Sequence, residues 1–246
     1  MNINLYLDST YLKTPAQSGL SEAETLNVVL QLTDEAIAHH IFAVMIRPDY
    51  VKQVKDYLAT KNTDVKVGTV IGFHEGTNAT GTKLQEAEKA IAAGADELDF
   101  VLNYEAFKNR QMDLVKDEVI SCTRLCLKHG KIAKWIIEIA ALTDEEISEI
   151  TRNISHWITT EFPGQEEMVF VKSSTGFYQT EGGKPNGATF EGIAIMLQNS
   201  GKLPVKAAGG VRTPEDAEKM IQLGVKRIGT SSAVALLRNE ESGGGY

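Results

Sequence analysis

Short apolar stretches alternate with amphipathic stretches along this chain of 246 residues. The apolar stretches are rich in β-branched and aromatic residues, a composition typical of buried strands. We predict eight strands, at Ile3–Asp8, Phe42–Ile46, Val65–Gly72, Glu97–Asn103, Lys134–Ile139, from Val169 towards Phe177, Pro204–Ala208 and Arg227–Gly229. Helical segments separate these strands, so the chain repeats a strand–loop–helix unit.

Several helix boundaries carry specific signals. Ser21 with Glu24, and Thr143 with Glu146, have the spacing of a capping box, which marks a helix start. Thr213 before Pro214 indicates another start, because proline fits the first helical turn. We predict helices over about 21–40, 49–59, 83–93, 114–129, 143–161, 189–200 and 213–224, with a short one ending near Leu237.

Eight strands alternating with helices, with no linker between them, favour one α/β domain. The simplest closed arrangement is a (β/α)8 TIM barrel, which has about this length. We expect the barrel to span residues 1–238 and to be followed by a flexible tail at 239–246, which is polar and rich in glycine. An open, doubly wound sheet is the alternative, but neither Gly-x-Gly-x-x-Gly after the first strand nor a Gly-Lys-Ser/Thr loop is present.

Composition excludes several classes of function. The net charge of −8 argues against binding to nucleic acid. The start of the chain lacks the pattern of a signal peptide, and no apolar run approaches the length of a membrane span. Cys122 and Cys126 are best read as reduced core thiols of a cytoplasmic protein. The five histidines form no ligand cluster, so we predict no metal.

Charged side chains occupy the inward face of the middle strands. Alternation places Val169 and Val171 on one face of their strand, and Lys172 on the other with Phe170 and Ser174. The same alternation turns six charged residues inward, namely Glu97, Asp99, Lys134, Glu138, Lys172 and Lys206. A single lysine could reach solvent at a strand end, and a lattice of ion pairs could simply fill the barrel. Six converging charges instead favour a polar active site at the carboxyl ends of the strands.

Two of these lysines suggest a particular chemistry. Lys172 and Lys206 lie on neighbouring predicted strands and would enter one cavity. Burial and a nearby positive charge both favour a neutral amine, which is the nucleophile that forms a Schiff base with a carbonyl. Asp99 could then move the proton on the adjacent carbon, alone or with Lys206. The protonated imine withdraws electrons, so this chemistry needs no metal or organic cofactor.

The last two strands end in small residues that suit an anion. Gly209 and Gly210 follow the seventh strand, and Ser231 and Ser232 follow the eighth, each before a helix start. Backbone amides at helix starts bind anions, and these two loops form the usual phosphate site of this barrel. We therefore expect a phosphate-bearing substrate, with Arg212 adding charge or lying in solvent.

Four segments together resemble deoxyribose-phosphate aldolase. They are Asp96-Glu97-Leu98-Asp99, Val171-Lys172-Ser173-Ser174-Thr175-Gly176-Phe177, Lys206 to Thr213, and Arg227-Ile228-Gly229-Thr230-Ser231-Ser232. The similarity runs from about Asp8 to Leu237. It implies a class I aldolase on a (β/α)8 barrel that reversibly cleaves 2-deoxy-D-ribose 5-phosphate to D-glyceraldehyde 3-phosphate and acetaldehyde. Family members are commonly cytoplasmic, often dimeric, and act in deoxynucleoside catabolism.

The resemblance also implies roles for individual residues. Lys172 would form the Schiff base, Lys206 would lower its pKa, and Asp99 would take part in proton transfer. Tyr246, at the end of the tail, would visit the site and assist proton transfer. The implied substrate-binding residues are Thr10, Lys134, Gly176, Gly209, Gly210, Arg212, Gly229, Ser231 and Ser232.

Some positions differ from the family pattern, namely Ser9, Met45, Arg47, His74 and the long loop at 178–187. They bear on the choice of acceptor more than on the class of reaction. Two alternatives therefore stay open. One is a related Schiff-base aldolase with another phosphorylated acceptor, and the other is a catalytically silent barrel that binds a sugar phosphate.

Overall fold

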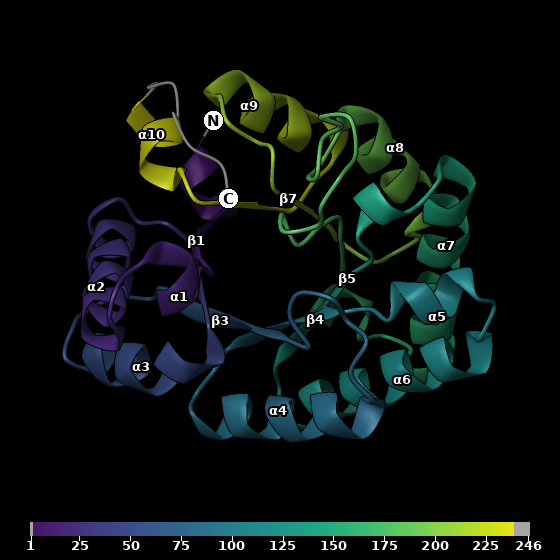
Figure 1. The fold of residues 1–246 in the computed structure, drawn as a ribbon, viewed down its shortest axis with the longest axis horizontal. Coiled ribbons are helices and arrows are strands. Elements are labelled where there is room, and N and C mark those ends of the chain that lie inside the picture. The colour runs from purple at the N-terminus through teal and green to yellow at the C-terminus, as the bar shows by residue number, and fades with distance from the viewer. Residues whose placement is uncertain (1, 239–246) are drawn as a thin grey trace.

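The chain folds into a closed barrel of parallel strands. In a computed structural model, which describes residues 2–238, eight strands follow one another in chain order and β8 pairs with β1 (Figure 1). The strands are β1 (Leu7–Tyr11), β2 (Ala43–Ile46), β3 (Lys66–Ile71), β4 (Glu97–Val101), β5 (Ile132–Ile136), β6 (Val169–Lys172), β7 (Val205–Ala208) and β8 (Arg227–Thr230). The predicted (β/α)8 barrel and its single domain are confirmed.

Helices surround the ring of strands (Figure 1). The larger ones are α2 (Glu22–Ala38), α3 (Val51–Ala59), α4 (Thr80–Ala92), α6 (Met112–Lys128), α7 (Asp144–Glu161), α8 (Phe190–Asn199) and α9 (Pro214–Leu223). Three short helices add to them, α1 (Pro15–Ser18), α5 (Tyr104–Lys108) and α10 (Ala233–Arg238). The sequence signals did not predict α1 or α5, which are a single turn or little more.

The predicted helix caps are confirmed. The Ser21 hydroxyl accepts from the backbone of Glu24, whose carboxylate accepts from the backbone of Ser21, and Thr143 with Glu146 repeats this exchange. Thr213 caps α9, with Pro214 in the first turn. These bonds satisfy amide groups that no helical carbonyl reaches, and so they fix where each helix begins.

The main hydrophobic core lies between the outer face of the barrel and the helices. Trp135 is fully buried there, stacks on Phe100 with ring centroids 5.0 Å apart, and donates through its indole N–H to the Thr123 hydroxyl. Val169 and Val171 of β6 belong to the same core. The predicted outward faces of β4, β5 and β6 are therefore correct, and the opposite faces point into the barrel.

Three predicted strands differ from the observed ones by three residues or more at one end or both, and one of them, β6, ends at Lys172 instead of running towards Phe177. Residues Ile3–Tyr6 form a 3-10 helix, and β1 begins only at Leu7, where pairing with β2 and β8 becomes possible. Strand β5 begins at Ile132 and ends at Ile136, short of the predicted Ile139. Its end is set by Glu138, whose φ of 58° is left-handed and cannot continue a strand.

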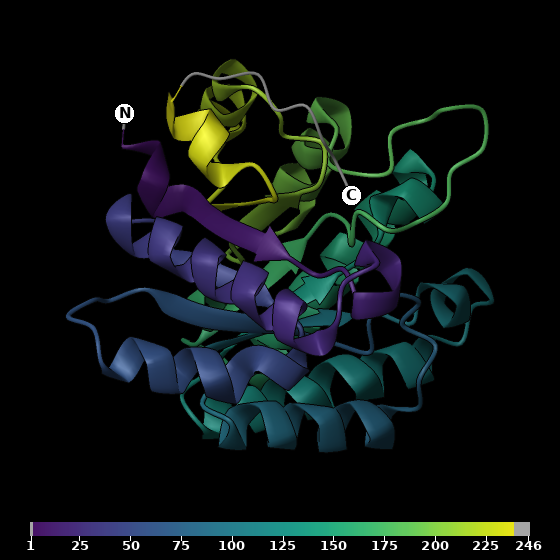
Figure 2. The ribbon, with the colours of Figure 1, turned by 60° about the vertical axis from the view of Figure 1, so that its left-hand side comes forward.

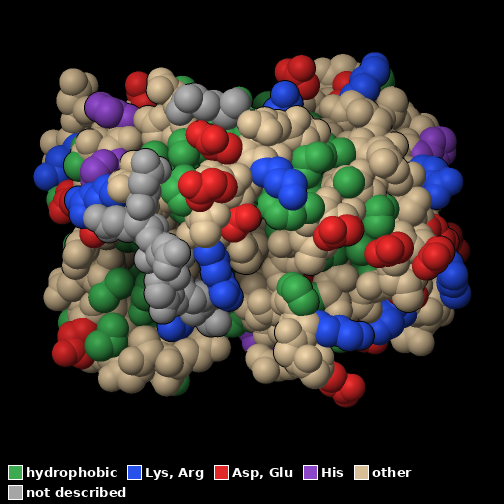
Figure 3. Space-filling view, turned by 90° about the horizontal axis from the view of Figure 1, so that it is seen from above, with side chains coloured by type: hydrophobic (Ala, Val, Ile, Leu, Met, Phe, Trp, Pro, Cys, Tyr) green, Lys and Arg blue, Asp and Glu red, His purple; other side chains and the backbone are tan. Residues whose placement is uncertain are grey.

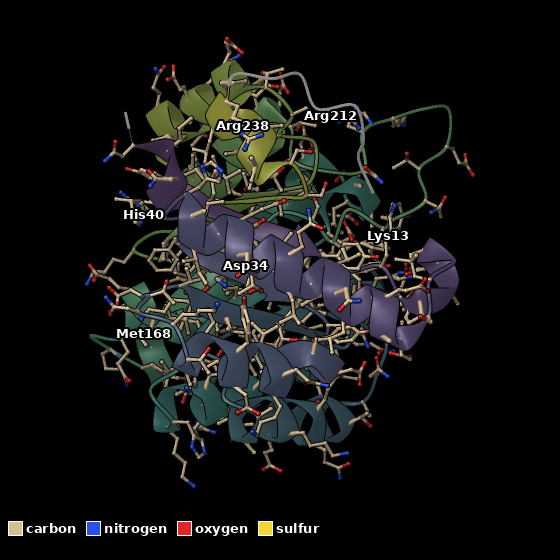
Figure 4. The ribbon with its side chains drawn as sticks, turned by 90° about the vertical axis from the view of Figure 1, so that its left-hand side faces the viewer. Lys13, Asp34, His40, Met168, Arg212 and Arg238 are labelled. Atoms are coloured by element: carbon tan, nitrogen blue, oxygen red, sulfur yellow. The ribbon has the colours of Figure 1, made fainter. Side chains whose placement is uncertain are left out.

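The two ends of the barrel differ. In Figure 4, His40 and Met168, which precede strands, lie at one end, and Lys13 and Arg212, which follow strands, lie towards the other. The loop from β6 to α8 stands out from the carboxyl end of the barrel (Figure 2). Acidic and basic side chains are interspersed on the side that carries α9 and α10 (Figure 3). Within residues 2–238, no helix has both the length and the apolar character needed to cross a bilayer.

Candidate active site

Asp99 is the centre of the charge cluster inside the barrel. Its Oδ2 accepts hydrogen bonds from Lys172 Nζ and Lys206 Nζ, each at 2.9 Å, and its Oδ1 accepts from Lys134 Nζ at 2.7 Å. The four side chains are almost completely buried. They come from β4, β5, β6 and β7, whose registers place Asp99 beside Lys134 and Lys172 beside Lys206. The structure thus brings together the four charged residues that the sequence placed at the reaction centre.

A second layer of charge lies beneath this centre. Arg227 Nε donates to Asp8 Oδ1 at 2.8 Å, and Arg227 Nη1 donates to Glu97 Oε1 at 3.0 Å. Asp8 Oδ2 lies 2.6 Å from Lys206 Nζ, and Glu97 Oε2 lies 2.6 Å from Lys134 Nζ. Buried charges must be paired to offset the cost of desolvation. The lower layer supplies these partners and holds both lysines in place.

Sequence reasoning missed two members of this layer. Asp8 was placed at the end of the first strand, and Arg227 was not assigned to the interior. Both signals were present, because Leu7 and Ile228 are apolar neighbours that pack outward and strand alternation turns Asp8 and Arg227 inward.

Burial controls the protonation of Lys172. It lowers the pKa of this lysine to about 8, and Lys206 acts in the same direction, while Asp99 opposes both. About a tenth of the Lys172 amines are then neutral at pH 7, several hundred times more than for an ordinary lysine. Burial and Lys206 thus both act in the predicted direction, and a neutral Lys172 is suited to attack a carbonyl.

Asp99 and Lys134 keep their charges. Burial alone would raise the pKa of Asp99, but Lys134, Lys172 and Lys206 together hold it well below its ordinary value. Burial alone would lower the pKa of Lys134, but Asp99 and Glu97 raise it. Asp99 and Lys134 thus stay ionised around the one lysine that titrates near neutral pH.

Three glycines pack backbone to backbone beside the centre. A Cβ on Gly209 would lie 3.1 Å from the Cα of Gly187 and 3.5 Å from the Cα of Gly176, and a Cβ on Gly187 would lie 2.5 Å from the carbonyl carbon of Gly209. Gly176, Gly209 and Gly210 all have positive φ, at 82°, 73° and 78°. Only glycine combines this backbone with such close approach, so the loops after β6 and β7 meet here. The Ala188 N–H joins them by donating to Ala208 O at 3.1 Å and to Gly209 O at 3.0 Å.

The remaining predicted substrate residues have varied surroundings. Gly229 lies within β8 rather than in a loop, and a Cβ there would lie 3.1 Å from Lys206 Cε, so its missing side chain leaves room for that lysine. Ser231 is exposed, and the backbone N–H of half-buried Ser232 donates to Thr230 Oγ1 at 3.1 Å. Arg212 is exposed in the loop after β7. Thr10 is buried in β1, and its hydroxyl donates to Asp8 O at 2.9 Å.

Aromatic side chains form another part of the mouth of the barrel. The Phe177 ring stacks on His74 with centroids 5.6 Å apart and meets Phe73 edge-on at 5.0 Å. The Arg47 guanidinium lies 4.8 Å from the centre of the Phe73 ring, and its Nε donates to Leu12 O at 2.7 Å. These contacts tie the loops after β1, β2 and β3 to the loop after β6. Arg47 and His74, two departures from the family pattern, therefore contribute to the wall of the mouth.

Glu138 is a second buried carboxylate on this side of the barrel. Its Oε2 accepts from the Thr175 backbone N–H at 3.1 Å and also from the Thr175 hydroxyl. Burial raises the pKa of Glu138 to about 7, although Thr175 and Lys172 oppose the shift. The sequence turned Glu138 inward but gave it no role.

Two further predictions concern the tail and a metal. Tyr246 and the tail at 239–246 lie outside the described residues. Among residues 2–238, no three His, Cys, Asp or Glu side chains gather as metal ligands would.

The comparisons with known proteins agree with this geometry. Residues 13–241 match the family model described as DeoC/LacD family aldolase. The chain is 40% identical to a deoxyribose-phosphate aldolase of Thermococcus kodakarensis over 233 residues, which cover 94% of each chain. The fold is similar to that of a solved protein titled QR15, an aldolase, with a TM-score of 0.78, 34% identity and coverage of 97% of this chain and 95% of the other. It is also similar to the deoxyribose phosphate aldolase of Aeropyrum pernix, whose structure is described as tetrameric, with a TM-score of 0.73, 27% identity and coverage of 96% and 89%.

Proposed function

The chain belongs to the DeoC/LacD family of aldolases, and from this membership we propose how its interior performs the reaction. It acts as a deoxyribose-phosphate aldolase that reversibly cleaves 2-deoxy-D-ribose 5-phosphate to D-glyceraldehyde 3-phosphate and acetaldehyde. The observation that carries the mechanism is the shared carboxylate oxygen. Asp99 Oδ2 accepts from both Lys172 Nζ and Lys206 Nζ at 2.9 Å, which places a titratable amine against a second ammonium group.

Lys172 is the nucleophile in this proposal. Its neutral amine adds to the aldehyde carbon of the open-chain sugar, and loss of water gives a protonated imine. The imine then draws the electron pair of the bond between the second and third carbons into an enamine, and that bond breaks. Glyceraldehyde 3-phosphate leaves, and protonation and hydrolysis of the enamine release acetaldehyde.

Lys206 and Asp99 support this cycle electrostatically. Burial is the main cause of the low pKa of Lys172, and Lys206 lowers it further. Lys206 Nζ also donates to the same oxygen of Asp99 as Lys172 does. Because the pKa of Asp99 is low, its carboxylate is a weak base. We therefore assign Asp99 the role of bridging Lys172 and Lys206. A proton then passes between these two lysines, both of which are hydrogen-bonded to Asp99.

The loops after β6, β7 and β8 are assigned to the phosphate. Gly176, Gly209 and Gly210 have positive φ and no side chain that would keep a ligand from their backbone, and Ser231 and Ser232 begin the loop after β8. Arg212 supplies a positive charge at the same end of the barrel (Figure 4). Lys134 and Thr10 are assigned to the hydroxyl side of the substrate. The two anchored ends would hold the sugar across the barrel mouth.

Assembly, location and the tail belong to the same proposal. We propose a homodimer acting in the cytoplasm, where free, buried Cys122 and Cys126 would remain reduced. Tyr246 is proposed to assist proton transfer at the enamine carbon, because family members with such tails are thought to use it so.

A direct assay tests the proposal. Purified protein incubated with deoxyribose 5-phosphate should release acetaldehyde, which alcohol dehydrogenase and NADH report as a loss of absorbance. The Lys172→Met variant is the matched control, since it keeps the length of the side chain without the amine. Binding of the sugar phosphate with no release of acetaldehyde would instead identify a silent binding barrel.

A further inference from the structure

Glu138 combines three features that the mechanism above does not use. It is 1% exposed, it has a left-handed backbone with φ of 58°, and its Oε1 has no hydrogen-bond partner among residues 2–238. A buried oxygen without a partner destabilises the fold, and so does a left-handed backbone at a residue other than glycine. A fold accepts such costs chiefly at functional sites.

The backbone around Glu138 places it beside the Schiff-base lysine. The Ile137 N–H donates to Lys172 O at 3.0 Å, and the Ile139 N–H donates to Ser173 O at 2.9 Å. Between these two hydrogen bonds, the segment at the end of β5 advances two residues while the segment at the end of β6 advances one. This is the pattern of a β-bulge. Bulges redirect side chains and are frequent next to active sites.

A second unpartnered group lies in the same layer. The Ser174 hydroxyl is completely buried and has no hydrogen-bond partner among the described residues. Ser174 follows Lys172 by two residues, the spacing that returns to the same face of an extended chain. Glu138 likewise follows Ile136, the register partner of Lys172, by two residues. Ser174 therefore lies beyond Lys172 towards the mouth, and Glu138 lies beside Ser173, because the amides on either side of Glu138 donate to Lys172 O and Ser173 O.

The substrate runs through this layer. Its first carbon is bound to Lys172 and its phosphate lies at the mouth, so its middle carbons occupy the level between them. The hydroxyl on the third carbon must lose its proton when the carbon–carbon bond breaks. Asp99 is a poor acceptor for that proton, because Lys134 and Lys206 still donate to its two oxygens while Lys172 is in the imine.

We propose that Glu138 is the base that accepts the proton of the third-carbon hydroxyl, with the Ser174 hydroxyl orienting that group; this rests on the function proposed above. The proton moves from the hydroxyl to Glu138 Oε1, and the oxygen's electron pair forms the new carbonyl bond. The bond between the second and third carbons breaks, and its electrons neutralise the iminium to give the enamine on Lys172. Glu138 returns its proton to solvent after the aldehyde departs.

The surroundings of Glu138 suit this task. The titratable groups that interact with it are Lys172 on β6 and Tyr104 on α5, while Thr175 holds its other oxygen. The pKa of Tyr104 is raised to about 12, chiefly by burial, so it stays neutral in the working range. A carboxylate whose pKa is near 7 accepts and releases protons efficiently at neutral pH.

The Glu138→Gln variant distinguishes loss of the proposed base from a general disturbance of the active-site geometry. Glutamine keeps an oxygen for Thr175 but cannot accept the proton. We expect kcat for cleavage of deoxyribose 5-phosphate to fall by roughly 100-fold or more, with little change in KM. Exchange of the methyl protons of acetaldehyde in D2O should stay within about threefold of wild type, because that half-reaction uses Lys172 but no third-carbon hydroxyl. Glu86→Gln is the matched control, a half-buried glutamate outside the barrel whose pKa burial also raises.

The outcomes are distinct. Near-normal cleavage by Glu138→Gln would overturn the proposal, and so would equal losses in cleavage and exchange, which would indicate loss of Lys172 geometry. A raised KM with unchanged kcat would also overturn it, since that result would show Glu138 only positioning the Thr175 loop. Wild-type protein that fails to cleave deoxyribose 5-phosphate would instead remove the proposed function itself.

A stability measurement gives an independent check. In wild type, the folded state holds a proton on Glu138 up to a pKa of about 7, above the ordinary glutamate value of 4.5. The contribution of Glu138 to stability is therefore lost as pH rises from about 4.5 to 7. We expect Glu138→Gln to raise Tm at pH 8 and to leave it nearly unchanged at pH 4. Equal Tm values for wild type and Glu138→Gln at pH 8 would contradict a buried Glu138 with a raised pKa.

Discussion

Asp99 and Glu138 show how neighbours divide the work of two buried carboxylates. Asp99 accepts from three lysines and stays ionised, whereas Glu138 accepts from Thr175 and titrates near neutral pH. Environments that push two pKa values apart mark different roles in acid–base chemistry. Lys172 adds a third titration near pH 8. The site thus contains a fixed anion, a base and a nucleophile.

Lys172 should be the residue that forms the covalent adduct. Borohydride added with deoxyribose 5-phosphate should reduce the imine and leave a mass increment on the peptide containing Lys172, with loss of activity. Lys206 is buried even more completely but faces two carboxylates, Asp8 and Asp99. An adduct on Lys206 would reverse the assignment of the two lysines.

Lys206→Leu should change the pH dependence of the reaction as well as its rate. Removing this charge takes away one influence that lowers the pKa of Lys172, so the rise of kcat/KM with pH should move above pH 8. Loss of pre-organised charge should also cost about 3 kcal/mol in the barrier. A pH–rate profile and circular dichroism would check both. A folded variant with the wild-type profile would exclude the paired-lysine argument.

Helices α4 and α6 are joined by a buried ion pair outside the barrel. Lys83 Nζ contacts Glu118 and donates to Gly76 O at 2.6 Å and to Val101 O at 2.7 Å, while Glu118 Oε2 accepts from Asn103 N–H at 3.0 Å. One lysine thus connects the loop after β3 with the end of β4. That loop carries Phe73 and His74, so the pair supports the aromatic wall of the mouth.

Lys83→Met should test this support. The change leaves Glu118 in the core without its cation, which costs about 3–5 kcal/mol of unfolding free energy. The double variant Lys83→Met with Glu118→Leu should be less destabilised than Lys83→Met alone, because no charge is then left unpaired. Urea denaturation of wild type, the two single variants and the double variant would measure the four unfolding free energies. If the double variant lost more unfolding free energy than the two single variants lose together, the pairing argument would be contradicted.

Gly187→Ala should weaken substrate binding through the loops. The added Cβ would lie 2.5 Å from the carbonyl carbon of Gly209, so the loop after β6 must move away from the loop after β7. We expect KM for deoxyribose 5-phosphate to rise about tenfold, a loss of about 1.4 kcal/mol in binding. Gly81→Ala in the first turn of α4 is the matched control, since a Cβ there meets nothing within 4 Å and its φ is not positive. Equal KM for both variants would place the phosphate elsewhere.

Sequence reasoning found most of this fold because its signals are local. Alternation oriented Asp99, Lys134 and Lys172 correctly, and side-chain caps located α2 and α7. The start of β1 was missed because its register depends on pairing with β8, more than 200 residues away. The turn at Glu138 was missed because glutamate carries no local signal for a left-handed backbone.

Charge is nearly balanced inside the barrel although the whole chain carries −8. Four cations, Lys134, Lys172, Lys206 and Arg227, face four carboxylates, Asp8, Glu97, Asp99 and Glu138. Each buried group depends on partners from other strands. The reaction centre and the stability of the barrel are therefore parts of one network.

Acid should unfold the barrel through this network. Burial alone would raise the pKa of Asp8, but Arg227 and Lys206 lower it from 3.8 to about 2. A lowered carboxyl pKa contributes stability above the unfolded value, and that contribution is lost as pH falls from about 4 to about 2. For Asp8 it amounts to about 2 kcal/mol. The difference in unfolding free energy between wild type and Asp8→Asn should shrink over this range, and a constant difference would contradict the pairing.

The division of charge between the two halves of the barrel has a consequence for synthesis on the ribosome. Three of the four inward carboxylates, Asp8, Glu97 and Asp99, lie on β1 and β4, whereas all four inward cations lie on β5 to β8. Translation adds about 5–20 residues per second, so the acidic half waits several seconds for the basic half. Arg227, which bonds to Asp8, emerges near the end. A nascent chain stopped after β4 should therefore remain sensitive to protease, and resistance should appear only when β8 has left the exit tunnel.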